Sequence, residues 1–239
     1  MMTKIAAHDR LILALDVPSA EEADRLMRRV EGTVRFVKIG LELYTAAGPD
    51  IVKRALDRGN RVFLDLKFLD IDETVRRATA RVAELGVEFL TVHANRKALN
   101  AAVEGREEHP LKLLAVTVLT NFDSADLRDM GIQWSVADLV VARAKLAAEL
   151  GCDGVVASGE EPAIIRRNVG PKLLIVTPGI RPAGKGLDDH ARPTTPTQSI
   201  KAGSDYLVVG RPIRDAEEPK EAAQAVLAEM QAAFDARPA

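Results

Sequence analysis

Residues 61–75 read RVFLDLKFLDIDETV, and this stretch decides the fold. It opens with an apolar run, VFL, of the kind expected for a strand that is buried on both faces. Asp65 and Lys67 follow two residues apart, so they share one face of that strand, because strand side chains alternate between faces. Asp70 comes next, and apolar positions at helical spacing predict a helix that opens at Thr74. The stretch therefore predicts a strand whose carboxyl end carries charge just before a helix.

The same unit recurs along the chain. Eight apolar strands are predicted, at residues 11–16, 34–40, 61–68, 89–94, 112–119, 154–158, 172–180 and 206–213. Segments of helical periodicity lie between them, and several end in a glycine suited to a helix C-cap, as at Gly32, Gly59 and Gly86. Connections between parallel strands are short and nearly always right-handed. Eight alternating units therefore predict an α/β fold, a single (β/α)8 TIM barrel domain over residues 1–239.

Two connections are longer than the others, at residues 120–133 and 182–196. Long loops in compact domains are often binding loops or lids. Both follow the carboxyl ends of predicted strands, where a barrel of this kind carries its active site. We therefore expect both loops to border the site.

Composition excludes several classes of partner. Lys and Arg total 33 against 35 Asp and Glu, which gives a net charge of −2 and no basic field for nucleic acid or membrane. No stretch approaches the roughly 18 consecutive apolar residues of a membrane span, and the start, MMTKIAAHDR, lacks a signal-peptide core. The single cysteine, Cys152, excludes an intramolecular disulfide framework and is typical of a reducing cytosol. We expect a cytoplasmic protein with no nucleic-acid or membrane partner.

The predicted strand ends bring together side chains of alternating charge. Asp16 ends the first strand, Lys38 lies in the second, and Asp65 with Lys67 ends the third. A buried ammonium without a partner is costly, so Lys38 requires carboxylates beside it. An ionic core layer without chemistry is the alternative, but it does not explain why the charges gather at one end. His93, at the end of the fourth strand, is expected to be a hydrogen-bonded core histidine.

Two clusters of glycine and arginine predict a phosphate site. The motif TPGIRP ends the seventh strand with Gly179 and Arg181, and VGRPI ends the eighth with Gly210 and Arg211. Glycine lets backbone amides approach an anion, and arginine offers a fork of donors. Loops after strands seven and eight of such barrels often bind phosphate. Either cluster alone is a weak signal, but the pair predicts a phosphorylated ligand.

With these motifs in place, the chain resembles the orotidine 5′-phosphate decarboxylase family over essentially its whole length. The resemblance is carried by LALD at 13–16, VKIG at 37–40, DLKFLDIDET at 65–74, VTVLT at 116–120, TPGIRP at 177–182 and VGRPI at 209–213. The D-x-K-x-x-D element is also found in sugar-phosphate lyases of the same superfamily. Lys38 separates the two, because those relatives typically have an acidic, metal-binding residue at that position.

The resemblance implies a catalytic group of four residues. Lys67 would be the proton donor, flanked by Asp65 and Asp70, with Lys38 completing the charge network. Asp70, together with Ile71 and Thr74, would be presented to the site of a neighbouring subunit, so the active unit would be a homodimer. The remaining substrate contacts would come from Asp16 and Lys38 at the ribose, Thr120 near the pyrimidine, and Arg181, Gly210 and Arg211 at the 5′-phosphate.

His190 stands where alignment on R-x-x-T-P places a glutamine of the family's phosphate loop. It would donate to the phosphate or the pyrimidine, or it is a solvated loop histidine, and the sequence leaves both interpretations open.

The implied function is that of a carbon–carbon lyase. It would convert orotidine 5′-monophosphate to uridine 5′-monophosphate, the last step of de novo pyrimidine nucleotide synthesis, with no cofactor and no metal. One alternative is a magnesium-dependent sugar-phosphate lyase or decarboxylase of the same superfamily, against which Lys38 argues. The other is a non-catalytic barrel that binds a nucleotide phosphate, which would not require the charged network.

Overall fold

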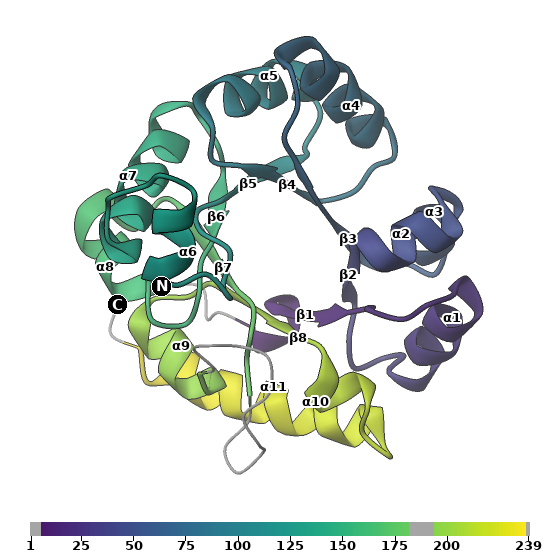
Figure 1. Cartoon of the computed structure of the whole chain (residues 1–239). Coiled ribbons are helices and arrows are strands. Elements are labelled where there is room, and N and C mark those ends of the chain that lie inside the picture. The colour runs from purple at the N-terminus through teal and green to yellow at the C-terminus, as the bar shows by residue number, and fades with distance from the viewer. Residues whose placement is uncertain (1–5, 182–193, 238–239) are drawn as a thin grey trace.

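The computed structural model describes residues 6–181 and 194–237. Within them, eight parallel strands pair in sequence order and close into a barrel, because β1 pairs with β2 on one side and with β8 on the other. Helices surround the barrel on the outside (Figure 1). The predicted (β/α)8 barrel is confirmed.

The strands are β1 Leu11–Ala14, β2 Phe36–Gly40, β3 Arg61–Phe68, β4 Phe89–His93, β5 Lys112–Val116, β6 Gly154–Val156, β7 Leu174–Thr177 and β8 Tyr206–Val209. The helices are the 3-10 turn η1 Ala7–Asp9, then α1 Ala20–Arg29, α2 Leu41–Ala47, α3 Asp50–Asp57, α4 Asp72–Glu84, α5 Arg96–Arg106, α6 Ser124–Asp129, α7 Val136–Glu149, α8 Pro162–Val169, α9 Pro196–Ala202, α10 Arg211–Arg214 and α11 Pro219–Asp235. Among these helices, none combines the length and apolar character needed to cross a membrane.

Both ends of the third strand were predicted correctly, at residues 61 and 68, but several boundaries of other helices and strands were wrong. Residues 211–213 belong to helix α10 and not to the end of β8, because Pro212 occupies the first turn of that helix, where the fixed φ of proline favours a helix. Helix α4 begins at Asp72 and not at Thr74. Strand β5 stops at Val116, where its pairing with the short strand β6 ends. The long connection after it contains α6, which a capping box at Asp123 begins.

The barrel interior divides into an aromatic floor and a polar mouth. Phe36, Phe63, Phe89 and Tyr206 pack ring against ring near the amino ends of their strands, with centroids 5.1–6.1 Å apart. The guanidinium of Arg61 lies 4.2 Å from the centre of the Phe36 ring, on the outer side of this floor. Packed aromatic side chains therefore fill the amino end of the barrel interior, and basic side chains such as Arg61 and Lys112 stack on their rings.

Helices α4 and α5 approach so closely that their contact requires a glycine. A Cβ atom at Gly105 of α5 would lie 2.1 Å from the carbonyl oxygen of Arg76 in α4, far below a van der Waals contact. The obstacle is backbone, so no side-chain rotation relieves it. The spacing of these two helices therefore depends on Gly105.

Replacing Gly105 with alanine should lower the free energy of unfolding by about 1–3 kcal/mol, the usual cost of overpacking a tight interface. Urea unfolding measures the change. Asn100→Ala, on an exposed position of the same helix, is the matched control and should change stability by less than about 0.5 kcal/mol. Equal stability of the two variants would contradict the close approach of α4 and α5.

Candidate active site

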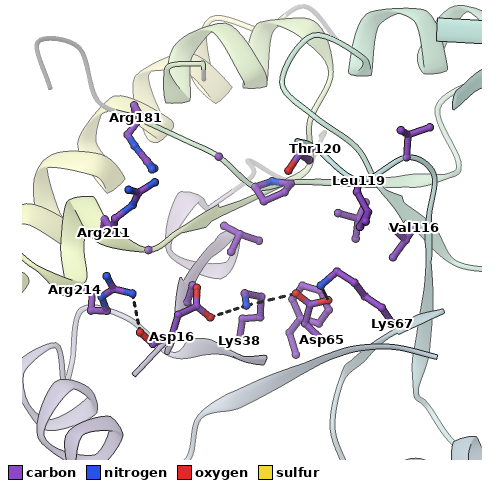
Figure 2. Close-up of a pocket in the computed structure, with 18 residues that line it drawn as sticks. Asp16, Lys38, Asp65, Lys67, Val116, Leu119, Thr120, Arg181, Arg211 and Arg214 are labelled. Carbon is purple, nitrogen blue, oxygen red and sulfur yellow. Dashed lines mark hydrogen bonds and ion pairs between the residues drawn. The ribbon is translucent and has the colours of Figure 1, made fainter. Parts of the chain in front are cut away.

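A pocket opens at the carboxyl ends of the strands, with a cavity volume of about 480 Å³ (Figure 2). This size is within the usual range for small-molecule sites. Its lining combines a row of alternating charges, an apolar wall and three arginines: Asp16, Lys38, Asp65 and Lys67; Val116, Val118, Leu119 and Thr120; and Arg181, Arg211 and Arg214. In Figure 2 the row and the arginine pair Arg181 and Arg211 occupy different sides of the pocket.

Four side chains from three neighbouring strand ends form the charged row. The Nζ of Lys38 lies 3.0 Å from Oδ1 of Asp16 and 3.4 Å from Oδ2 of Asp65. The other oxygen of Asp65, Oδ1, accepts a hydrogen bond from the Nζ of Lys67 at 2.8 Å. Each cation thus has a carboxylate beside it, as the sequence required of Lys38. The pairing Asp16–Lys38–Asp65–Lys67 was predicted from the strand ends alone.

Space for Lys38 comes from a glycine two residues later. A Cβ atom at Gly40 would lie 3.0 Å from the Nζ of Lys38 and 3.4 Å from Oδ1 of Asp16. The order V-K-I-G in β2 therefore places the ammonium in an apolar strand and removes the side chain that would crowd it.

The pairing fixes the charge states of the row. Burial alone would lower the pKa of the Lys38 ammonium, but the charges of Asp65 and Asp16 outweigh it and raise that pKa above its ordinary value. Burial would raise the pKa of the Asp65 carboxyl, but Lys38 and Lys67, with a hydrogen bond from Thr91, hold it below its ordinary value. Both groups are therefore charged at neutral pH.

Lys67 has a backbone conformation that is unusual for a residue with a side chain. Its φ of 50° lies in the left-handed region, and the pairing of β3 with β4 shifts register between Leu64 and Phe68. Thr91 of β4 stabilises this geometry, because its Oγ1 accepts a hydrogen bond from the Lys67 N–H at 3.0 Å and donates one to Oδ1 of Asp65 at 2.9 Å. Strain of this kind is concentrated at functional sites, where the surroundings hold it in place.

The opposite side of the pocket carries the arginines. Arg181 is buried, with a relative exposure of 9%, and its guanidinium donates to the carbonyl oxygen of Ile180 at 2.9 Å. Arg211 begins α10, directly after Gly210, and its guanidinium faces that of Arg181 in Figure 2. Two guanidinium groups that face one another form a site suited to an anion with several acceptor oxygens, such as a phosphate.

Arg214 connects the two sides. It lines the pocket, and its guanidinium donates to the carbonyl oxygen of Asp16 at 2.7 Å (Figure 2). Sequence reasoning missed Arg214 because residues 206–213 were taken as one strand, which ended the motif one residue too early. It also missed Thr91, for which the signal is a hydroxyl within the otherwise apolar strand FLTVH.

The wall between the two sides comes from the end of β5 and the residues after it. Val116, Val118 and Leu119 supply apolar surface, and Thr120 lines the pocket beside them, as expected. Arg143 of α7 donates a hydrogen bond to the carbonyl oxygen of Thr117 and so fixes this segment from outside.

Three predicted site residues lie away from the pocket of their own chain. Asp70, Ile71 and Thr74 are exposed, and Oδ1 of Asp70 accepts a hydrogen bond from the N–H of Ile71 at 2.6 Å. Ile71 is 72% exposed, and the apolar side chains of Leu41 and Leu69 are exposed as well. His190 lies outside the described residues.

The prediction that His93 is hydrogen-bonded was wrong. Its ring is half-buried and makes no hydrogen bond within residues 6–181 and 194–237. Burial, reinforced by the charges of Arg143 and Lys67, lowers the pKa of the His93 ring, so the neutral form is favoured. Over the same residues, no group of three or more His, Cys, Asp or Glu side chains is arranged to hold a metal ion.

Comparisons with known proteins agree with this geometry. A family model described as "Orotidine 5'-phosphate decarboxylase / HUMPS family" matches residues 9–226. The orotidine 5'-phosphate decarboxylase of Nitrobacter winogradskyi is 49% identical, over 94% of this chain and 93% of its own. That of Bradyrhizobium diazoefficiens is 48% identical, over 98% of each chain. The crystal structure of orotidine 5'-phosphate decarboxylase from Lactobacillus acidophilus aligns with a TM-score of 0.82 and 37% identity, over 92% of this chain and 98% of that one.

Replacing Lys38 with methionine should destabilise the fold at neutral pH by about 3 kcal/mol, because it leaves Asp65 and Asp16 without their shared cation. The depressed pKa of Asp65 contributes stability above about pH 4 that is lost as the pH falls through its folded-state pKa. The raised pKa of Lys38 contributes stability below about pH 10.5 that is lost as the pH rises through its folded-state pKa. The difference between wild type and variant should therefore be widest between these limits.

Urea unfolding followed by circular dichroism at about pH 7 and about pH 2 measures this difference. Lys53→Met is the matched control, since Lys53 is an exposed lysine of α3 whose partner, Asp50, lies 3.8 Å away. It should change stability by less than about 1 kcal/mol at either pH. If the Lys38→Met variant were as stable as the Lys53→Met variant, this would contradict the conclusion that Lys38 stabilises the fold by neutralising Asp16 and Asp65.

Proposed function

The chain belongs to the orotidine 5′-phosphate decarboxylase / HUMPS family, and on that premise we propose that its pocket decarboxylates orotidine 5′-monophosphate to uridine 5′-monophosphate without a cofactor. One observation carries the proposal more than any other. A row of alternating charges that ends in Lys67 shares a single pocket with the facing arginines Arg181 and Arg211. The first can act on a carboxylate-bearing ring, and the second can hold the phosphate of the same nucleotide.

The reaction breaks the bond between C6 of the pyrimidine and its carboxylate. The electron pair stays on C6 as carbon dioxide leaves, and a proton then has to reach C6. The ring delocalises this carbanion poorly, so fixed charge must stabilise it. Lys67 supplies an ammonium for that purpose and donates a proton from its Nζ to C6.

The two lysines differ in what their surroundings permit. Lys38 lies between two carboxylates, which raise its pKa and hold its proton. Within the described residues of its own chain, Lys67 has one carboxylate partner, Asp65, and a side chain that is 30% exposed at the pocket. We assign proton donation to Lys67, and to Lys38 the task of keeping Asp65 ionised and in place.

The other contacts follow from where each side chain lies. Arg181, Gly210 and Arg211 would bind the 5′-phosphate, and Asp16 with Lys38 would bind the ribose hydroxyls. Thr120 would lie near the pyrimidine, at the end of the apolar wall. Contacts far from the reacting carbon can stabilise the reactive arrangement, because binding energy from remote groups lowers the barrier when it is realised in the transition state.

The active unit would be a homodimer in which each pocket is completed by its partner. Asp70, Ile71 and Thr74 belong to the DLKFLDIDET motif at 65–74, yet they are exposed and outside the pocket of their own chain. Exposed Leu69 and Ile71 beside them, and Leu41 at the start of α2, supply apolar surface of the kind that a dimer buries. These features support presentation of Asp70 to a neighbouring pocket.

The remaining assignments concern the setting of the reaction. We place the enzyme in the cytoplasm, where it would catalyse the last step of de novo pyrimidine nucleotide synthesis. We treat the chain as a single barrel domain. Cys152 is buried as a free thiol whose pKa burial raises to about 12, so it is unreactive at neutral pH. For the metal-dependent alternative, Lys38 is the obstacle, because a paired ammonium occupies the position of an acidic metal ligand.

Wild-type protein should convert orotidine 5′-monophosphate to uridine 5′-monophosphate, and pre-treatment with a chelator should leave the rate unchanged. Lys67→Ala should lower kcat by at least about 10³-fold, because it removes both the stabilising cation and the proton donor. The absorbance change of the pyrimidine gives the rate. Lys53→Ala, on the exposed face of α3, is the control and should keep wild-type activity. Loss of activity with the chelator would instead favour a metal-dependent lyase.

Mixing two inactive variants tests the shared pocket. Lys67→Ala and Asp70→Asn, unfolded and refolded together, should recover about one quarter of wild-type activity, because half of the dimers are mixed and each has one intact site. Mixing Lys67→Ala with Arg211→Ala is the matched control and should give no recovery, since both residues belong to the same chain's pocket. Full activity of Asp70→Asn alone, or no recovery in mixed dimers, would refute the shared site.

A further inference from the structure

The segment after β7 and the segment that begins at Thr194 are joined beside the pocket. Ile180 and Thr194 form an isolated parallel bridge. The N–H of Arg181 donates to the carbonyl oxygen of Thr194 at 2.9 Å. The backbone of the buried arginine at the phosphate end is therefore fixed to Thr194, and any movement of Thr194 moves Arg181.

Thr194 is itself held on its far side by helix α9. Its Oγ1 donates to Oε1 of Gln198 at 3.2 Å. The next residue, Thr195, forms a capping box with Gln198 at the start of that helix. Thr194 is buried, with 9% exposure, and so has a defined place between the segment after β7 and helix α9.

A third contact, with the turn after β6, depends on the absence of a side chain. A Cβ atom at Gly159 would lie 2.0 Å from Cγ2 of Thr194 and 2.6 Å from its Cβ. Rotation about χ1 of Thr194 moves Cγ2 but leaves Cβ where it is. Carbon atoms in contact prefer about 3.5–4 Å, so a side chain at Gly159 requires a backbone movement of about 1 Å.

The turn that contains Gly159 resists such a movement more than Thr194 does. The N–H of Ser158 donates to Oε2 of Glu161 at 2.8 Å, and the N–H of Glu161 donates to the carbonyl oxygen of Ser158 at 3.1 Å. Glu161 is buried, and Pro162 begins helix α8 directly after it. The turn is closed by two hydrogen bonds and anchored in a helix, so Thr194 is the side that yields.

We propose that Gly159 is a positioning residue for phosphate recognition: its missing side chain sets the place of Thr194, which in turn sets the place of Arg181. The inference rests on the proposed function, because it takes Arg181 as a ligand of the 5′-phosphate. Gly159 touches neither the substrate nor the reacting atoms. Its effect is confined to the arginine end of the pocket and leaves the charged row of β1 to β3 in place.

Binding of uridine 5′-monophosphate and of inorganic phosphate, measured by calorimetry, tests this role alongside kcat, KM and thermal unfolding. Gly159→Ala should weaken both ligands by about 10- to 100-fold, since a displacement of 1 Å at a binding group can cost that much. It should raise KM more than it lowers kcat. Gly105→Ala is the matched control, because it too introduces a severe Cβ clash, in this case with the backbone of Arg76, but the clash lies between α4 and α5, away from Arg181. It should lower the melting temperature with no loss of phosphate binding.

Second substitutions at Thr194 separate an effect on phosphate binding from a general loss of stability. Thr194→Gly removes both atoms that a Cβ at Gly159 would meet and keeps the carbonyl that Arg181 uses. Gly159→Ala/Thr194→Gly should therefore recover most of the phosphate affinity, and Gly159→Ala/Thr194→Ser, which keeps the Cβ, should recover less. This order holds even if Gly159→Ala alone is too unstable to measure, because the two double variants are compared with one another.

Several outcomes overturn the proposal. They are wild-type phosphate affinity in Gly159→Ala, an equal loss in Gly105→Ala, or no difference between the two double variants. Wild-type protein that binds neither ligand would remove the phosphate site and the role of Gly159 together. Wild-type protein that binds both but does not turn over orotidine 5′-monophosphate would overturn the proposed decarboxylation and leave Gly159 in its role.

Discussion

The site depends on one constraint, the burial of the Lys38 ammonium in an apolar strand. A charge in that position is tolerated only with carboxylates on both sides, and Asp16 and Asp65 provide them at 3.0 and 3.4 Å. Asp65 then has a second oxygen, which holds Lys67 at the pocket. Lys67, to which we assign proton donation, is thus placed by the carboxylate that neutralises Lys38. Its position follows from the electrostatics of the strand ends and does not depend on a bound ligand.

The barrel imposes this constraint because successive side chains along each strand point alternately into the barrel and out toward the helices. In β3, Phe63 points into the aromatic floor, Leu64 packs outward against the helices, and Asp65 points inward again at the mouth. Lys67 departs from this regular pattern through its left-handed backbone, which Thr91 stabilises. The regular part of the strand serves the core, and its irregular end serves the site.

Most of the fold was predictable because strand spacing and turn chemistry are local. Asp16, Lys38, Asp65 and Lys67 were found from their places at strand ends, since a parallel barrel brings those ends together. What sequence reasoning missed depends on register and on contacts between distant segments. Thr91 matters only because β4 pairs with the shifted end of β3, and Arg214 only because α10 turns it back to Asp16. The prediction that His93 is hydrogen-bonded was wrong because burial does not by itself supply a partner.

The aromatic floor limits the routes by which substrate and products can enter and leave the barrel. Phe36, Phe63, Phe89 and Tyr206 fill the interior at the amino ends of the strands, and Arg61 stacks on the outer side of Phe36. In the part of the chain that the structure describes, these rings pack against one another and fill this end of the interior, as side chains do in barrels of this kind. On the proposed function, carbon dioxide would therefore leave through the same mouth of the pocket by which the nucleotide enters, so both products share one exit.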